Sequence, residues 1–295
     1  MGKTMRNLAI GTYCALMLSA CADVDDHWET RDFAIAGGEA APDASGVVAI
    51  LRTAGNSVGS CSGVLLAPTL VLTARNCVSA ITSDFIICAS AQFGAPYPAT
   101  ELRVSAAARL SNNESDYTSV SEVIVPTDSA VCGSAVALLV LESPLDATPF
   151  PPRLAQPVSS GETFTVYGYG PTDEMGAGSG TRRSLGGLEV SCVGDECEEA
   201  AEIASNEFVV EAPTCGADGG GPAVDEDGLV IGTSYRGSGG CTEGATVFSD
   251  VASWADFLTD GAQRAAGAGG YDAPEWAGGA TTAEPDMGAN GPDVG

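Results

Sequence analysis

Eight cysteines spread between residues 61 and 241 limit the folds open to this 295-residue chain more than any other feature. The other two of its ten cysteines, Cys14 and Cys21, lie near the start. An even set in an exported chain indicates disulfides, although the count alone leaves many pairings open. Zinc is a poor alternative, because there is no Cys-x-x-Cys pair and His27 is the only histidine. We expect no metal and no cofactor.

The first residues favour export. Lys3 and Arg6 precede an apolar run from Leu8 to Ala20, which is too short to span a bilayer, so residues 1–20 are predicted to be a signal peptide. Leu18-Ser19-Ala20-Cys21 resembles a bacterial lipobox, in which the cysteine is lipidated after cleavage. The alternative is an ordinary cleavage site that happens to adjoin a cysteine. With lipid on Cys21, residues 21–34 would be a tether to a membrane of the cell envelope; without it, the protein would be secreted.

The formal net charge of −27 bears on partners. Nucleic acid and anionic lipid headgroups would be repelled by such a surface, so neither is an expected direct partner. The acidity fits solubility or a saline habitat, and less well an acidic recognition face. Nothing in the sequence indicates an oligomeric state.

Pro213-Thr214-Cys215-Gly216-Ala217-Asp218-Gly219-Gly220-Gly221-Pro222 resembles the nucleophile loop of the chymotrypsin/trypsin family of serine proteases. Further stretches are similar to family motifs in the expected order: Ile35–Gly38, Val71–Cys77, Ser134–Leu141, Gly161–Gly170 and Gly232–Gly237. The resemblance covers residues 35–261. It implies an all-β fold of two packed six-stranded antiparallel barrels with a C-terminal helix.

The apolar pattern agrees with strands at 47–51 and 61–66, and we also expect a strand at 84–93. Val251, Trp254 and Leu258 would share one face of the terminal helix, with Gly261 as its stop. Residues 262–295 are rich in Gly, Ala and Asp without periodicity and are expected to be disordered.

The resemblance identifies three positions where family enzymes carry a catalytic triad. Asn76 stands where the histidine base is expected, Ala135 where the orienting aspartate is expected, and Gly219 where the nucleophilic serine is expected. An amide cannot shuttle a proton near neutral pH, and glycine has no nucleophile. Asp128 is too far along the chain from Ala135 to replace the aspartate.

Other site positions follow from the same resemblance. Ala217 and Gly219 match the backbone of the oxyanion hole, and Ile35 and Asp218 match the ion pair that forms on activation. The cut before Ile35 would follow Ala34, which is not basic. Pocket positions correspond to Pro213, Ser234 and Arg236, and Gly232–Gly237 resembles the strand edge that pairs with a substrate backbone.

The resemblance implies two disulfides, Cys61–Cys77 and Cys215–Cys241. For the remaining four cysteines the pairing stays open. Elimination favours Cys88 with Cys132, which is not a standard family bridge, and Cys192 with Cys197 as a local bridge.

The leading hypothesis is therefore a non-catalytic homologue of a trypsin-like endopeptidase: an exported, lipid-anchored binding or scaffolding protein of the cell envelope, with an envelope protein or peptide as its partner. An active serine-type endopeptidase with an unrecognised constellation is the alternative. A purely structural envelope protein without a specific ligand also remains open.

Overall fold

The computed structural model describes residues 38–55, 57–83, 86–173, 175–198, 202–212, 215, 218–237, 241 and 244–279. Contacts divide the chain into Met1–Arg31 and Asp32–Gly295, and all described residues belong to the second unit. The predicted signal peptide, tether and lipidation site at Cys21 lie outside the described residues. Within the described part, no helix is long and apolar enough to cross a membrane.

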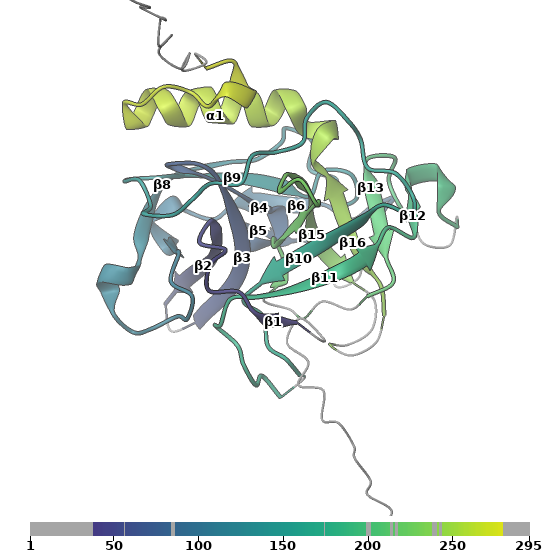
Figure 1. The fold of residues 1–295 in the computed structure, drawn as a ribbon, viewed down its shortest axis with the longest axis horizontal. Helices are drawn as coiled ribbons and strands as arrows, with labels where there is room; N and C mark the ends of the chain where they lie inside the picture. The colour runs from purple at the N-terminus through teal and green to yellow at the C-terminus, as the bar shows by residue number, and fades with distance from the viewer. Residues whose placement is uncertain are drawn as a thin grey trace, which may run out of the picture. The chain divides into compact units, whose positions relative to one another are not determined.

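The predicted all-β fold with a C-terminal helix is confirmed (Figure 1). Among the described residues, the first half forms a closed barrel in the order β2-β3-β4-β9-β8-β7. These strands are β2 (Val47–Ala54), β3 (Ser57–Ala67), β4 (Leu70–Ala74), β7 (Leu102–Ser105), β8 (Thr118–Ile124) and β9 (Val136–Leu141). A separate hairpin-like pair joins β5 (Ser79–Ile81) and β6 (Phe93–Pro96).

The second half of the described residues, together with β1 from their start, forms an open sheet of eight strands in the order β1-β11-β10-β14-β15-β16-β13-β12. Its hydrogen bonding is thus that of a half-barrel, whereas we expected a second closed six-stranded barrel. The strands are β1 (Glu39–Ala40), β10 (Thr163–Gly168), β11 (Arg183–Glu189), β12 (Cys192–Val193), β13 (Glu207–Val210), β14 (Pro222–Val224), β15 (Val230–Gly237) and β16 (Thr246–Asp250).

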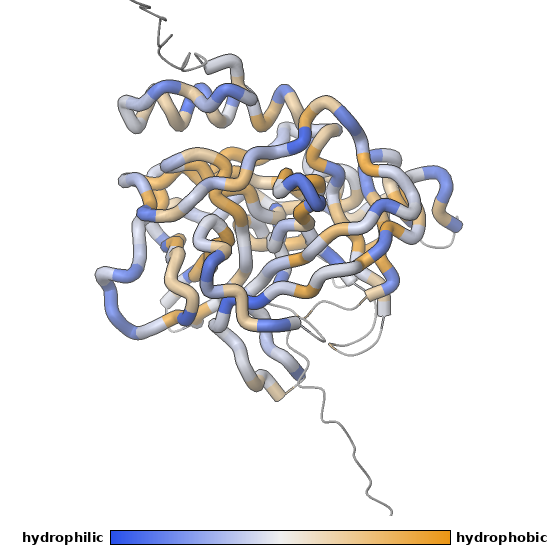
Figure 2. Tube along the Cα trace, in the orientation of Figure 1, coloured by the Kyte–Doolittle hydropathy of each residue, from blue (hydrophilic) through white to orange (hydrophobic). Residues whose placement is uncertain are grey.

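Strand β9 lies between the core of the first barrel and a second hydrophobic cluster under the terminal helix. All six of its residues are buried, because side chains on alternate positions enter two different clusters. Ala137, Leu139 and Leu141 face the barrel interior, while Val136, Leu138 and Val140 pack with the helix. Figure 2 shows the hydrophobic residues concentrated along these strands. The second core is aromatic, with Phe208 and Phe248 stacked at 5.1 Å across paired strands.

Helix α1 (Ala255–Gly269) is longer than the sequence suggested. We expected Gly261 to end it and disorder to begin at Ala262. Instead, a Cβ on Gly261 would lie 2.3 Å from a Leu138 methyl group, so this glycine allows close packing of the helix on the barrel. Ala262, Ala265 and Ala266 are buried beyond it, and alanine is the best helix former. A short 3₁₀ helix, η8 (Glu275–Ala277), follows, and the remainder of the predicted tail lies outside the described residues.

The strand predicted at 84–93 is wrong. Ala91 donates its N–H to the Ile87 carbonyl at 2.7 Å, which closes a turn, and the strand β6 begins only at Phe93. Cys88 lies in this turn and bonds to Cys132. The expected bridges Cys61–Cys77, Cys88–Cys132, Cys192–Cys197 and Cys215–Cys241 are all present.

Candidate functional site

Asn76 lies at the junction of the two halves. Strand β4 ends at Ala74, and the single turn η1 (Arg75–Cys77) delivers Asn76 while the Cys61–Cys77 bridge fixes that turn to β3. The Asn76 side-chain amide donates from Nδ2 to the Tyr235 carbonyl on β15 at 3.2 Å. Its Oδ1 is buried and has no hydrogen-bond partner in the structure. The Nδ2 of Asn76 thus makes a structural hydrogen bond, while its Oδ1 remains an acceptor without a donor.

Gly219 lies in a turn held between the two halves. Its carbonyl accepts the Ser62 N–H at 2.9 Å, and the next residue, Gly220, donates its N–H to the Ser234 carbonyl at 2.6 Å. Gly220 has a φ of +84°, and a Cβ there would lie 2.1 Å from Thr73 Oγ1, so only glycine fits. The turn is therefore packed tightly against β3, β4 and β15.

Ala135 is buried, and its carbonyl accepts the N–H of Arg75, the residue before Asn76, at 2.8 Å. The three triad-like positions predicted from the sequence are thus brought together. None of these three side chains can attack a carbonyl or transfer a proton near neutral pH. The Ser234 hydroxyl donates to the Asp218 carbonyl at 3.0 Å, and no histidine is present in the described part of the chain to activate it.

Arg75 fills the interior beside Ala135. It is buried, stacks over Phe93 at 5.0 Å and donates from Nη1 to the carbonyls of Pro126 and Asp128. Burial lowers the pKa of its guanidinium. The Asp128 carboxylate accepts from Ala130 N–H, which is the main reason its pKa is lowered, and from the Ser134 hydroxyl. Asp128 therefore serves a local turn and does not orient Asn76.

Asp218 is 2% exposed, and its carboxylate accepts the N–H groups of Gly170 at 2.7 Å and Cys215 at 3.1 Å. Burial raises its pKa to about 6. Its predicted partner Ile35 lies outside the described residues, as do Ala217 of the predicted oxyanion hole and Pro213 of the predicted pocket.

The pocket positions Ser234 and Arg236 line a cavity of about 180 Å³ together with Asn76, Cys215, Gly219 and Tyr235. Arg236 does not point freely into solvent. Its Nε donates to the Tyr235 hydroxyl at 2.7 Å, and its Nη2 donates to the Glu202 carbonyl at 2.7 Å and lies 3.4 Å from the Glu207 carboxylate.

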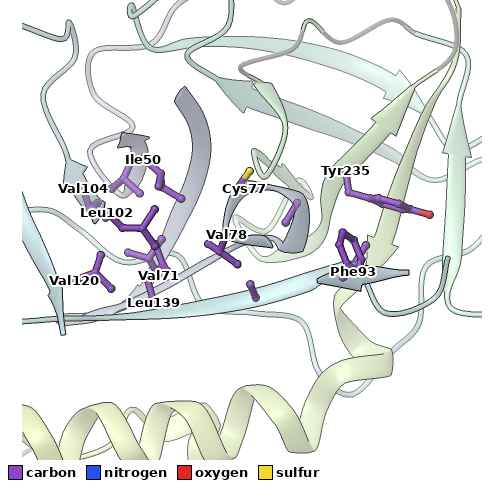
Figure 3. Packing of buried hydrophobic residues seen from close by; sticks show 14 of the residues in the cluster. Ile50, Val71, Cys77, Val78, Phe93, Leu102, Val104, Val120, Leu139 and Tyr235 are labelled. Carbon is purple, nitrogen blue, oxygen red and sulfur yellow. The ribbon is translucent and has the colours of Figure 1, made fainter. Parts of the chain in front are cut away.

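Glu207 is a residue that the sequence analysis missed. It is fully buried at the start of β13 and accepts from the Tyr235 hydroxyl at 2.8 Å and from the backbone N–H groups of Gly133 and Ala204. A glutamate beside Phe208-Val209-Val210 in an apolar strand was the available signal, because a buried carboxylate needs partners. Tyr235 is consequently only 5% exposed, and it lies in the same hydrophobic cluster as Phe93 (Figure 3).

A second cavity, of about 150 Å³, lies on the other side of Asn76 and is lined also by Ile50, Arg52, Ser60, Cys61 and Tyr97. The Arg52 guanidinium stacks 3.4 Å above the Tyr97 ring and pairs with Glu101 at 2.9 Å. Among the described residues, no group of three or more His, Cys, Asp or Glu side chains is placed to hold a metal ion.

Comparison with known proteins agrees with the fold. A family model described as Trypsin matches residues 35–258. Human heparin binding protein is similar in structure, with a TM-score of 0.58 and 22% identity over 76% of this chain and 95% of that one. A double mutant of the same human protein gives a TM-score of 0.59 and 24% identity over 77% and 96%. At these identities the likeness shows the fold alone. No curated protein sequence matches the chain.

Proposed function

The chain belongs to the trypsin family, and on that premise we propose that it is a non-catalytic member whose cleft binds an extended segment of another envelope protein without cutting it. The observation that carries this proposal is the bond from Asn76 Nδ2 to the Tyr235 carbonyl beside Gly219. The Asn76 side chain, at the position predicted for a general base, makes a structural hydrogen bond instead, and Gly219 has no nucleophilic group.

The free edge of strand β3 supports binding of an extended segment. Strand β3 pairs with β2 from Ser57 to Val64, but with β4 only from Val64 onward. The Ser62 N–H points away from β2, onto the Gly219 carbonyl, and backbone groups alternate along a strand. The N–H and carbonyl of Ser60 therefore point to the same side, where no strand pairs with β3 in the described part of the chain. We call this side of Ser57–Cys61 the β3 edge.

An extended polypeptide is the ligand that such an edge fits. Alternating donors and acceptors along a strand are satisfied by a second strand, which is how β-augmentation works. The 150 Å³ cavity adjoins Ser60 and offers the Cys61–Cys77 bridge, Ile50 and Tyr97 to a side chain of the added segment. Val58 on the same edge is 68% exposed, and an added strand would cover it.

Heparin binding, for which the human protein is named, is not supported for this chain. The net charge is −27, and five arginines of the described residues are already paired with carboxylates: Arg52, Arg103, Arg153, Arg236 and Arg264. Arg75 and Arg182 are buried and donate to carbonyl oxygens. With this net charge, a highly sulfated polyanion would be repelled by the chain as a whole.

The binding proposal is tested with Ser60→Pro and its matched control Ser60→Ala. Peptides would be selected from a displayed random library against the purified protein. Proline removes the outward N–H without breaking a β2 hydrogen bond, whereas alanine keeps that N–H. Affinity should fall roughly five- to thirty-fold for the proline variant, as the loss of one or two bonds of about 1 kcal/mol predicts, and stay unchanged for alanine. Equal binding by all three proteins would contradict the proposal.

Export and anchoring form a separate part of the proposal. Four disulfides indicate an extracellular or exported protein. We propose that Cys21 carries the lipid that holds the protein at a bacterial envelope membrane. Labelled palmitate should be incorporated by the wild type and by Cys14→Ser, and lost with Cys21→Ser; labelling of Cys21→Ser would contradict this. A cut before Ile35 would release the domain, so N-terminal sequencing of the membrane fraction should not give Ile35.

A further inference from the structure

The half of the cleft next to Tyr235 is closed by the chain's own residues. The Tyr235 ring is 5% exposed, its hydroxyl bonds Glu207, and the Arg236 guanidinium lies 5.5 Å from its ring. The backbone edge of β15 is also occupied, because the carbonyls of Ser234 and Tyr235 accept from Gly220 and Asn76. A segment bound in the cleft would thus find the aromatic ring buried and these two carbonyls of β15 already bonded.

Residues from both halves of the fold hold this closure in place. Glu202 accepts the Cys88 N–H on its carboxylate at 3.2 Å, and its carbonyl accepts from Arg236. Gly133, next to Cys132, donates its N–H to Glu207 and accepts from the Asn206 side chain at 2.8 Å. We call these residues, Cys88, Cys132, Gly133, Glu202, Asn206 and Glu207, the bracket.

The Cys88–Cys132 disulfide joins the two first-half segments of the bracket. The base of the turn that carries Cys88 is joined to the segment before Cys132, because Val131 donates its N–H to the Ala91 carbonyl and Phe93 donates to the Ser129 carbonyl. The disulfide adds a covalent link at the tip of this turn, at Cys88 itself. Both cysteines are half-buried, which leaves the bridge within reach of a reductant. Glu202, the residue that Cys88 contacts, has a φ of +50°, a left-handed conformation that a glutamate keeps only when its surroundings impose it.

We propose that the Cys88–Cys132 disulfide is a redox-sensitive strap that keeps the Tyr235 half of the cleft closed, and that a dithiol reductant opens it. Two electrons and two protons pass from the dithiol to the bridge, so that its S–S bond breaks, two thiols form and the dithiol closes to its own disulfide. The tip of the turn at Cys88 is then no longer held to Cys132, Cys88 and Glu202 move apart, Glu202 no longer holds Arg236, and the Tyr235 ring becomes accessible. This step is independent of whether a segment binds the β3 edge.

Nitration by tetranitromethane, mapped by mass spectrometry on the full exported protein, tests the strap. The reagent attacks accessible phenolate, and burial raises the pKa of the Tyr235 hydroxyl, so the oxidised wild type should react slowly there. In Cys88→Ser/Cys132→Ser the nitration of Tyr235 should rise about ten-fold or more, as local opening predicts. Tyr169, buried elsewhere, should stay protected and reports that the fold is intact.

Cys192→Ser/Cys197→Ser is the matched control, because it removes a bridge that bonds none of Gly133, Glu202 and Glu207, and its Tyr235 should remain protected. Should the first variant fail to fold, which nitration of Tyr169 would reveal, the wild type is titrated with dithiothreitol. Tyr235 nitration should then follow reduction of Cys88–Cys132 while Tyr169 remains protected. Tyr235 that stays protected after this bridge is broken in a folded protein would overturn the proposal, as would equal exposure in the control.

Discussion

The carbonyl of Gly219 accepts the backbone N–H of Ser62 at 2.9 Å, so the loop that would carry a nucleophile is tied to strand β3. Both ends of this contact matter for the proposed function. Gly219 lines the 180 Å³ cavity together with Asn76. The Ser62 N–H points away from β2 toward Gly219, so the backbone groups of the β3 edge point to that same side of β3. The same loop is thus connected to both features on which the proposed binding function rests, the cavity beside Asn76 and the β3 edge.

Asn76→Ala should test the structural role of this residue. The substitution removes the bond to the Tyr235 carbonyl, so the free energy of unfolding should fall by about 1 kcal/mol. Urea denaturation measures the change. Asn113→Ala is a suitable comparison, because Asn113 is an exposed cap far along the chain. An Asn76→Ala protein as stable as the wild type would show that this bond does not stabilise the junction.

The pH dependence of the free energy of unfolding should reveal the raised pKa of the Asp218 carboxyl. Its pKa is raised from 3.8 to about 6 in the folded state, so its favourable contribution is complete below pH 4 and is lost as pH rises through 6. The loss should approach about 3 kcal/mol, since each pKa unit is worth about 1.4 kcal/mol. Other groups titrate too, so the difference between wild type and Asp218→Asn is the quantity to measure. A difference that does not change between pH 4 and 7 would contradict the assignment.

Two glycines of α1 give a matched pair. Gly261→Ala places a methyl group 2.3 Å from a Leu138 methyl, so the protein should be destabilised by about 1–3 kcal/mol although alanine favours helix. Gly267→Ala meets nothing within 4 Å and should stabilise by up to about 1 kcal/mol. Thermal unfolding of both variants distinguishes packing from helix propensity. A stabilising Gly261→Ala would mean that the helix does not pack on β9 as described.

Removing Glu207 should be among the more damaging single changes. Glu207→Ala leaves Arg236 without its carboxylate and leaves the Tyr235 hydroxyl and the Gly133 N–H without their acceptor, so a loss of about 3–5 kcal/mol is expected. Arg236→Ala alone should cost less, because Arg236 is partly exposed. A double-mutant cycle measures the coupling. Additive effects would show that the two residues do not interact.

The fold could be predicted from the sequence because its signals are local. Motif order, cysteine spacing and continuous apolar strands such as Val136–Leu141 carry the family resemblance, which implied Cys61–Cys77 and Cys215–Cys241. For Cys88–Cys132 and Cys192–Cys197 there was only a preference by elimination, and the structure confirms both bridges. The extent of α1 could not be predicted from Gly261 alone, since a helical glycine that permits close packing looks the same in sequence as one that ends a helix.

The closed half of the cleft could not be predicted for a related reason. Gly232–Gly237 resembles an open substrate edge, yet Tyr235 is buried. Two residues some thirty positions earlier hold this part of the chain: Glu207 accepts from the Tyr235 hydroxyl, and the Glu202 carbonyl accepts from Arg236. Such pairings depend on tertiary contacts between loops, for which local patterns carry no signal. Whether the second sheet closes into a barrel likewise depends on pairing between strands that are far apart in the sequence.

The proposed function requires that the cleft bind a peptide segment without cutting it. The most direct measurement incubates the purified protein with a peptide selected on its β3 edge and with a fluorophosphonate probe, and follows both by mass spectrometry. The peptide should be recovered intact to the same extent as in a buffer control, and no serine should be labelled. Peptide cleavage above that control, or a fluorophosphonate adduct on any serine, would contradict it.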